Sequence, residues 1–142
     1  MDRDGADIIH LGVGDPDFDT PAGIVDTAVS ALKNGRTHYA PIPGESELRN
    51  AVAAACSDNI GAEIQADRVC IFPGAQCALF ATMLCLAGPG DEVILLEPFY
   101  ATYEGVAQAG GATVIKVPLS PDDDFSLDID SIANAVTDKT RV

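Results

Sequence analysis

The chain has 142 residues, of which 47% are hydrophobic and 21% are charged, so it is long enough to bury one substantial core. Its net charge of −14, from 22 acidic and 8 basic residues, disfavours binding to nucleic acid or to an anionic membrane. No apolar run approaches the roughly 18 residues of a membrane span, and no signal-peptide core follows the N-terminus, so the sequence predicts a cytoplasmic protein.

The first half of the sequence predicts two amphipathic helices. The first begins with Thr20 as its capping residue and Pro21 in its first turn, and Gly35 ends it. Its apolar side chains recur at helical spacing and are expected to be buried: Val25, Ala28, Val29 and Leu32. The second helix runs from Glu45 to about Ser57, with one apolar face: Leu48, Val52, Ala55 and Cys56.

From residue 68 onward, strands and helices alternate along the chain. Strands are expected at about 68–72, 92–96 and 112–117, and helices at about 75–87, 99–108 and 128–136. This alternation predicts right-handed crossovers and an α/β fold, with three layers (αβα) and a mostly parallel sheet. Residues 140–142 resemble the start of a further strand, so the chain reads as the front part of a larger protein.

The helix expected at 75–87 begins without a capping residue. Pro73 and Gly74 lead directly into an apolar stretch that lacks Ser, Thr, Asp or Asn at its start. The first four N–H groups of a helix have no partner within it, and a glycine there lets a ligand approach the backbone closely. Two interpretations remain open from these residues alone, a phosphate bound to the amides or an ordinary turn whose amides bind water.

The remaining polar residues predict no metal site. The four cysteines lack a C-x-x-C pair and fall within apolar stretches, which favours packing over redox or metal chemistry: Cys56, Cys70, Cys77 and Cys85. The acidic run 122–124 is expected in an exposed turn. Three further acidic residues are expected to cap a loop and not to form a catalytic pair: Asp15, Asp17 and Asp19.

Five segments, in this order, carry a resemblance to a known family. They are L-G-V-G-D-P-D-F-D-T-P at 11–21, T-H-Y-A-P-I-P-G-E-S-E-L-R at 37–49, P-G-A-Q-C-A-L-F at 73–80, G-P-G-D-E-V-I-L-L-E-P-F-Y-A-T-Y at 88–103 and G-G-A-T-V-I-K-V-P-L at 110–119. Together they resemble the class I and II aminotransferases, which are fold-type I pyridoxal-phosphate enzymes. The segments are similar both to the arginine:pyruvate type and to aspartate aminotransferases, so the substrate stays open.

The resemblance implies an organisation and an activity. Residues 1–36 would form an N-terminal segment at the small domain and active-site edge, and residues 37–142 an incomplete large cofactor-binding domain. The implied enzyme is a homodimer that uses pyridoxal 5'-phosphate to transfer an amino group between an α-amino acid and a 2-oxo acid. Two alternatives remain, a pyridoxal-phosphate-dependent β-lyase of sulfur amino acids and a non-catalytic phosphate-binding or interaction module.

The resemblance also implies roles for residues of the cofactor site. The backbone N–H groups of Gly74, Ala75 and Gln76 would bind the cofactor phosphate, which leaves the Gln76 side chain dispensable. Tyr100 would stack on the pyridine ring, at a position where many relatives have tryptophan. Tyr103, three residues later, is expected to pack in the interior.

Two residues nearer the N-terminus match other family positions. Tyr39 would reach the phosphate in the partner subunit's site, and the backbone of Gly14 would contact the substrate carboxylate. Considered locally, Tyr39 fits an ordinary loop and Gly14 fits a tight turn before Pro16. The family's Schiff-base lysine, its pyridine-binding aspartate and its carboxylate-binding arginine come later than residue 142. No catalytic residue is therefore assigned here, and this chain alone is expected to be inactive.

Overall fold

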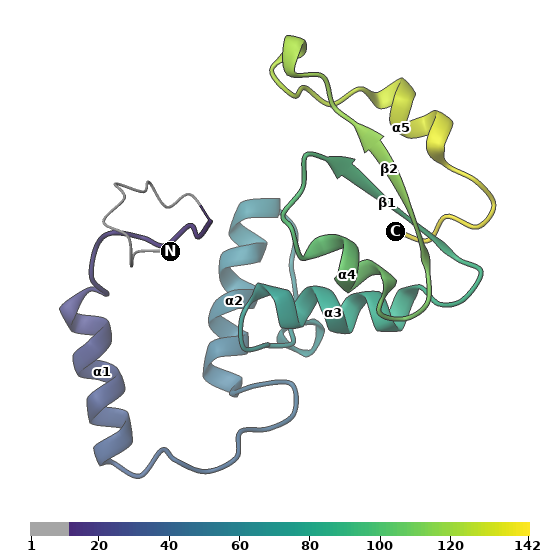
Figure 1. Ribbon diagram of the computed structural model, residues 1–142. Coiled ribbons are helices and arrows are strands. Elements are labelled where there is room, and N and C mark those ends of the chain that lie inside the picture. The colour runs from purple at the N-terminus through teal and green to yellow at the C-terminus, as the bar shows by residue number, and fades with distance from the viewer. Residues whose placement is uncertain (1–11) are drawn as a thin grey trace, which may run out of the picture. The chain divides into compact units, whose positions relative to one another are not determined.

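The computed structural model describes residues 12–142, and the chain divides into two compact units, residues 1–40 and 41–142 (Figure 1). The first unit contains one described helix, α1 (Ala22–Lys33). The second contains α2 (Ser46–Ile60), α3 (Ala75–Leu86), β1 (Glu92–Glu97), α4 (Tyr103–Gln108), β2 (Thr113–Pro118) and α5 (Ile129–Ala135). The segment predicted at 1–36 lies partly outside the described residues, and its assignment to a domain stays a prediction.

Helix α1 forms as expected, but two details of the prediction are wrong. Pro21, not Thr20, stands at the N-cap position, and no side chain caps the helix. None of its residues is buried, and Leu32 is 61% exposed, although a buried apolar stripe was expected. Because α1 is the only element described between residues 12 and 40, these residues offer the stripe no packing partner. Gly35, with φ 81°, follows the end of the helix as predicted.

Helix α2 extends three residues beyond its predicted end and stops at Gly61, which has φ 71°. Its inward face is rotated from the predicted one: Ala53 is buried and Val52 half-buried, while Leu48 is 47% exposed. Hydrogen bonds to the following segment account for the rotation. The Arg49 guanidinium donates to the carbonyls of Ala66 at 2.6 Å and Val69 at 2.8 Å, so this polar side chain lies on the inward face.

Residues 68–72 do not form the expected strand. A short 3-10 turn covers Ala66–Arg68, and Val69 that follows it is extended. A strand requires a neighbouring chain to share its hydrogen bonds, and residues 41–142 provide only isolated links such as Ile71 N–H to the Pro43 carbonyl at 2.9 Å. At that point a Cβ on Gly44 would lie 2.7 Å from Ile71 Cβ, so the two backbones lie close together.

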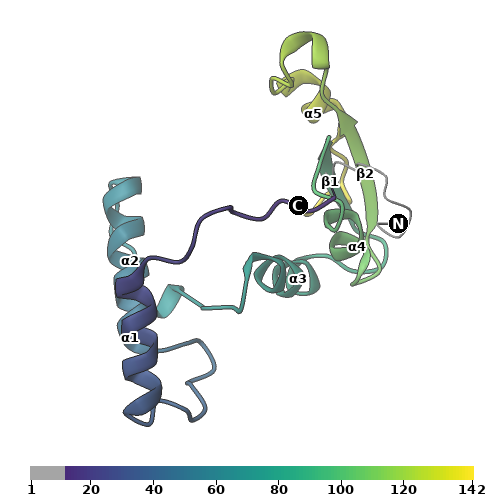
Figure 2. The same cartoon turned by 60° about the vertical axis from the view of Figure 1, so that its left-hand side comes forward.

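The centre of the second unit is a parallel sheet (Figures 1 and 2). Strand β1 pairs with β2 in the register Val93 to Val114, and on its other side Glu92 forms a parallel bridge with Thr140. Hydrogen bonds from Glu92 N–H to the Lys139 carbonyl and from Ile94 N–H to the Val142 carbonyl continue this side. The predicted parallel pairing is thus confirmed, whereas residues 140–142 form an isolated bridge and two further backbone hydrogen bonds beside β1 and not a full strand.

Successive segments are added to opposite sides of β1. It moves from β1 through α4 to β2, and then returns through α5 to the opposite side of β1. Because such crossovers are nearly always right-handed, the reversal places α4 and α5 on opposite faces of the sheet. Helix α4 packs against both strands and α5 against β2, which gives the predicted αβα layers.

The core of the second unit lies between α3, α4 and β1. Its buried side chains form one cluster, in which Val93 is fully buried: Met83, Ala87, Val93, Ala107 and Ala112. The chain passes so close to the end of α3 that a Cβ on Gly110 would lie 2.6 Å from the Ala87 carbonyl oxygen. An apolar cavity of about 70 Å³ remains between α3 and α4, lined in part by Leu79 and Tyr103.

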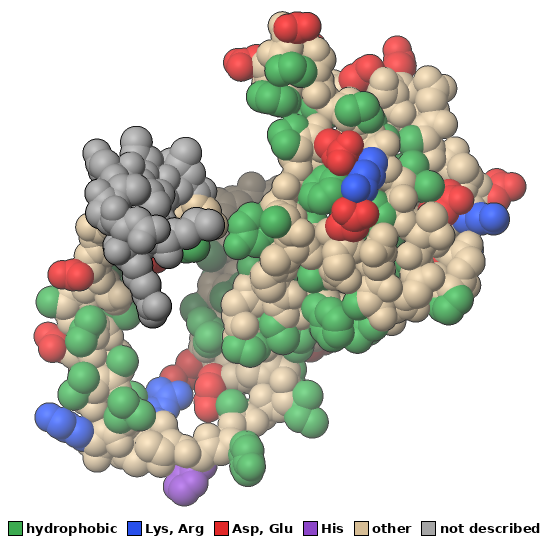
Figure 3. All heavy atoms as spheres, viewed as in Figure 1, with side chains coloured by type: hydrophobic (Ala, Val, Ile, Leu, Met, Phe, Trp, Pro, Cys, Tyr) green, Lys and Arg blue, Asp and Glu red, His purple; other side chains and the backbone are tan. Residues whose placement is uncertain are grey.

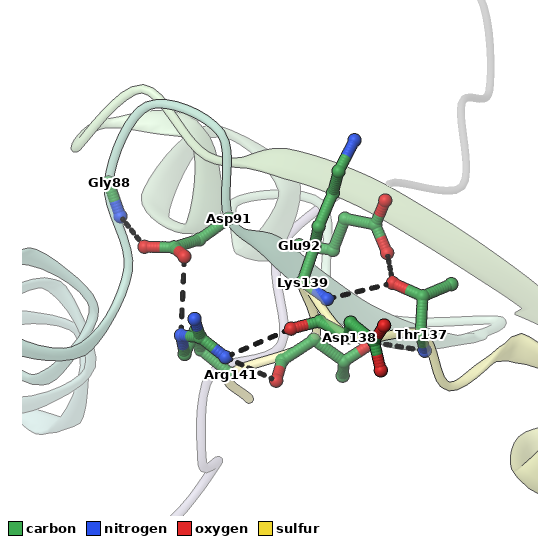
Figure 4. A network of polar contacts seen from close by, with 8 residues as sticks. Gly88, Asp91, Glu92, Thr137, Asp138, Lys139 and Arg141 are labelled. Atoms are coloured by element: carbon green, nitrogen blue, oxygen red, sulfur yellow. Dashed lines mark hydrogen bonds and ion pairs between the residues drawn. The ribbon is translucent and has the colours of Figure 1, made fainter.

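Polar contacts fasten residues 137–142 to the start of β1 (Figure 4). The Arg141 guanidinium lies between Asp91, whose carboxylate is 3.2 Å away, and the carbonyl of Asp138. The other Asp91 oxygen accepts from the Gly88 N–H at 3.0 Å. The Thr137 hydroxyl donates to the Glu92 carboxylate at 2.5 Å. The turn before β1 and residues 137–142 are therefore tied to one another.

Many apolar side chains remain on the surface (Figure 3). Only Met83 of helix α3 is buried, while Leu84 is 49% and Leu86 53% exposed. A helix that is apolar on nearly all sides would need packing partners on several faces. The expected burial of the cysteines is wrong within this chain, because Cys70, Cys77 and Cys85 are exposed and Cys56 is half-buried. Their apolar surroundings have no covering layer within residues 41–142. Residues 122–124 form the expected exposed turn.

Candidate functional site

The start of α3 has the geometry of an anion-binding site. Gly74 occupies the N-cap position with φ 87° and ψ 152°, a conformation open almost only to glycine, and no side chain caps the helix. Ala75 follows as the first helical residue, so the amides of the first turn have no partner within the helix. Their positive end of the helix dipole attracts an anion. The uncapped start that the sequence predicted is thus confirmed, while its ligand stays a prediction.

The Gln76 side chain turns away from solvent and joins this turn to α4. Its Nε2 group donates a hydrogen bond to the hydroxyl of Thr102, the N-cap residue of α4. Its Oε1 atom is buried and has no hydrogen-bond partner among residues 12–142. The first turn of α3 and the start of α4 are therefore adjacent.

The two tyrosines that precede and begin α4 differ in their surroundings. Tyr100 is 63% exposed, whereas Tyr103 is 37% exposed and lines the apolar cavity below α3. The rings meet edge to face, with centroids 5.8 Å apart and planes inclined by 62°. Tyr103 thus lies partly against the cavity and meets the ring of Tyr100 edge to face, so the interior packing that the sequence predicted is only partial. The exposed ring of Tyr100 remains available to stack on a planar ligand.

The position of these residues within the sheet favours a ligand site. Tyr100 and Thr102 belong to the loop that follows the carboxyl end of β1, and the adjacent strand β2 sends its own connection to the opposite face. In open α/β sheets, ligands bind outside the carboxyl ends of strands where neighbouring connections diverge in this way. Gln76 brings the amides of α3 to the same loop.

A lysine at this edge of the sheet is already engaged. The Lys116 ammonium lies 2.9 Å from the Glu104 carboxylate and 3.8 Å from that of Glu97, and 5.5 Å from the centre of the Phe99 ring. Its hydrogen bond to Glu104 raises the pKa of Lys116 above the ordinary value. The two carboxylates therefore favour the charged form of this amine.

The other predicted site residues belong to the first unit. Gly14 is exposed and a Cβ there would meet no atom within 4 Å, while the Tyr39 side chain is fully exposed. Their roles toward substrate and partner subunit stay predictions. Within residues 12–142, no group of three or more His, Cys, Asp or Glu residues could hold a metal ion, and no helix is long and apolar enough to cross a membrane.

Two contributions to the site were missed from the sequence, the hydroxyl of Thr102 and the side chain of Gln76. Thr102 is part of the E-P-F-Y-A-T-Y segment that carried the resemblance, so its position was visible there. Its pairing with Gln76 was not, because 26 residues separate the two along the chain. Only the packing of α3 against α4 brings them together.

Known proteins resemble the chain in sequence and in structure. Residues 6–142 match the family described as aminotransferase class I and II. An arginine–pyruvate transaminase of Pseudomonas aeruginosa is 45% identical over 137 residues, which cover 96% of this chain and 35% of that protein. The solved structure of aspartate aminotransferase from Thermus thermophilus with maleate superposes with a TM-score of 0.91 at 35% identity, over 97% of this chain and 36% of that one.

A second solved structure agrees with the first. N-succinyldiaminopimelate aminotransferase from Mycobacterium tuberculosis superposes with a TM-score of 0.86 at 41% identity, over 92% of this chain and 35% of that one. The chain thus spans about 35% of the length of the relatives it matches. The predicted αβα fold, as part of the large domain of a fold-type I enzyme, is confirmed by these superpositions.

Proposed function

Because the chain belongs to the class I and II aminotransferase family, we propose that the full-length protein transfers an amino group between an α-amino acid and a 2-oxo acid, with pyridoxal 5'-phosphate as its cofactor. The observation that carries the proposal is the uncapped start of α3 at Gly74, set beside the loop of Tyr100 at the carboxyl end of β1. The proposal places the enzyme in the cytoplasm.

The residues at this edge fit the proposed cofactor. Its phosphate is an anion, which suits the amides of Gly74, Ala75 and Gln76, and its pyridine ring is planar, which suits the exposed ring of Tyr100. A Cβ on Gly74 would meet no atom within 4 Å, so the backbone there is open to a ligand. Pyridoxal phosphate supplies an electron sink for bonds at the amino acid's α-carbon.

The residues of this chain would bind and orient the cofactor and the substrate. The amides at the start of α3 neutralise the phosphate charge and fix one end of the cofactor. Tyr100 covers one face of the ring, excludes water from it and limits its tilt. The backbone of Gly14 is proposed to contact the substrate carboxylate, as the family resemblance suggests. Proton transfer and covalent attachment are assigned to residues outside this chain.

The relatives narrow the candidate substrates. The relative that is 45% identical is named for arginine and pyruvate, and several relatives at 32–39% identity are named for aspartate. We therefore propose arginine and aspartate as the first amino donors to test, with pyruvate as the first acceptor. The protein is also proposed to be a homodimer in which Tyr39, fully exposed on its loop, reaches the phosphate in the partner subunit's site.

The test uses the purified full-length protein. We expect it to bind pyridoxal phosphate with a change in visible absorbance, and to form alanine from pyruvate with at least one amino donor. Release of ammonia and pyruvate from a sulfur amino acid, with no amino transfer, would support the β-lyase alternative instead. A protein that binds phosphate but neither binds pyridoxal phosphate nor turns over would be the non-catalytic module.

A further inference from the structure

The inward stripe of α3 ends in a polar residue. Leu79, Met83 and Ala87 follow Gln76 at helical spacing, and these three face the apolar core or its cavity. Gln76 lies one turn before Leu79 on the same stripe, so its amide is directed toward α4 rather than toward solvent. A polar side chain in this place has to find a partner, and the Thr102 hydroxyl accepts its Nε2–H.

The contact closes one end of the α3–α4 interface. Farther along, that interface is apolar, with Leu79 and Met83 facing Val106 and Ala107 around the small cavity. At the end nearest the carboxyl end of β1, the two helices are joined by the hydrogen bond between Gln76 and Thr102 and not by apolar packing. Directional hydrogen bonds define a geometry more narrowly than apolar contacts do, because they weaken steeply as the angle departs from linear.

The two residues so joined stand directly beside the two halves of the candidate site. Gln76 lies in the first turn of α3, and Thr102 comes two residues after Tyr100. We propose that the Gln76 side chain is a positioning residue: through Thr102 it sets the spacing between the phosphate-binding amides of α3 and the stacking ring of Tyr100. This inference rests on the proposed function, and it gives the side chain a role that the backbone argument left out.

The Oε1 atom of Gln76 is buried, beside the hydrogen-bonded Nε2 of the same amide. An amide oxygen without a hydrogen-bond partner costs free energy when it is removed from water. Gln76 nevertheless keeps this atom inside, with no partner among residues 12–142, while its Nε2 holds Thr102.

The experiment compares two ligands on variants of the full-length protein: Gln76→Ala, Thr102→Val, their combination, and Thr102→Ser. Pyridoxal phosphate needs both the amides and the ring, whereas inorganic phosphate needs the amides alone. For Gln76→Ala and for Thr102→Val we expect the dissociation constant of pyridoxal phosphate to rise about three- to tenfold, the equivalent of one net hydrogen bond. That of inorganic phosphate should change less than about twofold.

Three further results are expected. The double variant should bind pyridoxal phosphate no more weakly than either single variant, because both remove the same contact. Thr102→Ser keeps the hydroxyl and should behave like the parent. The visible circular dichroism of the bound cofactor should change in Gln76→Ala, in Thr102→Val and in the double variant, but not in Thr102→Ser, since the ring is held less firmly when the contact is lost. Gln108→Ala, an exposed glutamine at the other end of α4, is the matched control.

The outcomes separate this role from the proposed function. Parent-like affinity and dichroism in Gln76→Ala would overturn the positioning role alone, as would additive effects in the double variant. An equal loss for both ligands would mean that the side chain holds the amides themselves, which also overturns it. A parent protein that binds inorganic phosphate but no pyridoxal phosphate would overturn the proposed function, and the positioning role with it.

Discussion

Two glycines of the second unit are required for different physical reasons. Gly74 has a backbone conformation, φ 87° and ψ 152°, that other residues rarely adopt, yet a Cβ there would have free space around it. At Gly110 it is the space that is missing, because a Cβ would lie 2.6 Å from a backbone oxygen of Ala87 that cannot rotate away. One position is set by conformation and the other by packing.

At Gly74 we expect alanine to be almost as harmful as valine. Either residue forces the N-cap out of its present conformation, at a cost on the order of 1 to 3 kcal/mol, and thereby moves the amides of α3. In the full-length protein, cofactor affinity measured by absorbance should fall for both variants. Gly61→Ala, at the left-handed end of α2, is the control, because it should lower the unfolding temperature but leave cofactor affinity intact. If Gly74→Ala binds as the parent does and only valine fails, crowding rather than conformation governs the site.

At Gly110 we expect alanine to destabilise the protein by about 1 to 3 kcal/mol, because the added methyl group overpacks the junction of α3 and β2. Gly105 provides the contrast within the same region. It lies inside α4, its Cβ would meet nothing within 4 Å, and alanine there should stabilise by about 0.5 to 1 kcal/mol through helix propensity. Urea unfolding of the two variants measures both effects, and shifts of the same sign would contradict the assignment.

Among the elements, those with strong periodicity or clear end signals were predictable from the sequence. The helices α1, α2, α3 and α5 and the strands β1 and β2 lie where their patterns place them. The predictions that failed depend on a packing partner. Residues 68–72 have strand-like side chains but no neighbouring strand within residues 41–142, and the apolar stripe of α1 has no packing partner among residues 12–40. A pattern predicts the element, whereas burial depends on what lies opposite.

The candidate site divides in the same way. The uncapped start at Gly74 and the difference between Tyr100 and Tyr103 were predictable, because each follows from residues close together in the chain. The bond between Gln76 and Thr102 was not, because it depends on the packing of two helices. The sequence suggested that the Gln76 side chain is dispensable, because its contact with Thr102 is not visible there.

Helix α5 has the clearest capping residue of the described elements. The Asp128 carboxylate accepts hydrogen bonds from the amides of Asp130 and Ser131, each at 3.1 Å, and from the Ser131 hydroxyl. The Ser131 hydroxyl is the main cause that lowers the pKa of Asp128 below its ordinary value. Because the folded state favours the charged form, the stabilisation is fully present above the ordinary pKa of about 4 and is lost as pH falls through the lowered value.

We therefore expect Asp128→Asn to lower the unfolding temperature near pH 7 and to matter less and less below pH 4. Asparagine keeps an oxygen for the amides but lacks the charge that interacts with the helix dipole. Thermal unfolding of parent and variant across pH 2.5 to 7 measures the difference between them, which removes the contribution of the other carboxylates. A difference that stays constant with pH would show that the charge of Asp128 contributes nothing.

Across the molecule, many large apolar side chains are left exposed by the described residues. Helices α1 and α3 expose large aliphatic side chains, and three of the four cysteines are exposed although they lie in apolar stretches. The chain spans about 35% of the length of its relatives, and we expect residues of the full-length protein to cover these faces.

This surface predicts a pattern of thiol labelling. In the full-length protein we expect Cys70, Cys77 and Cys85 to react slowly with a thiol reagent under native conditions, and rapidly in the 142-residue chain alone. Burial removes the access of the reagent to the thiol. Mass spectrometry of the labelled peptides assigns each site. Rapid labelling of all three in the native full-length protein would mean that these faces stay open.

The proposed dimer can be tested at its most exposed aromatic residue. If Tyr39 donates to the partner's phosphate, Tyr39→Phe should weaken cofactor binding by about 1.5 to 3 kcal/mol, as for a hydrogen bond to a charged group, while the protein remains dimeric in sedimentation. The ring is preserved, so packing is unchanged. A full-length protein that sediments as an active monomer would contradict the shared site.

The order of the strands has a consequence for how the protein folds. Strand β1 acquires both of its neighbours, β2 and residues 140–142, from the chain that directly follows it, and the contacts of Asp91 with Arg141 fasten the last of them. Segments close in sequence pair faster than distant ones. The sheet around β1 is thus built from one continuous stretch, residues 92–142, and we expect its pairing to form early in folding.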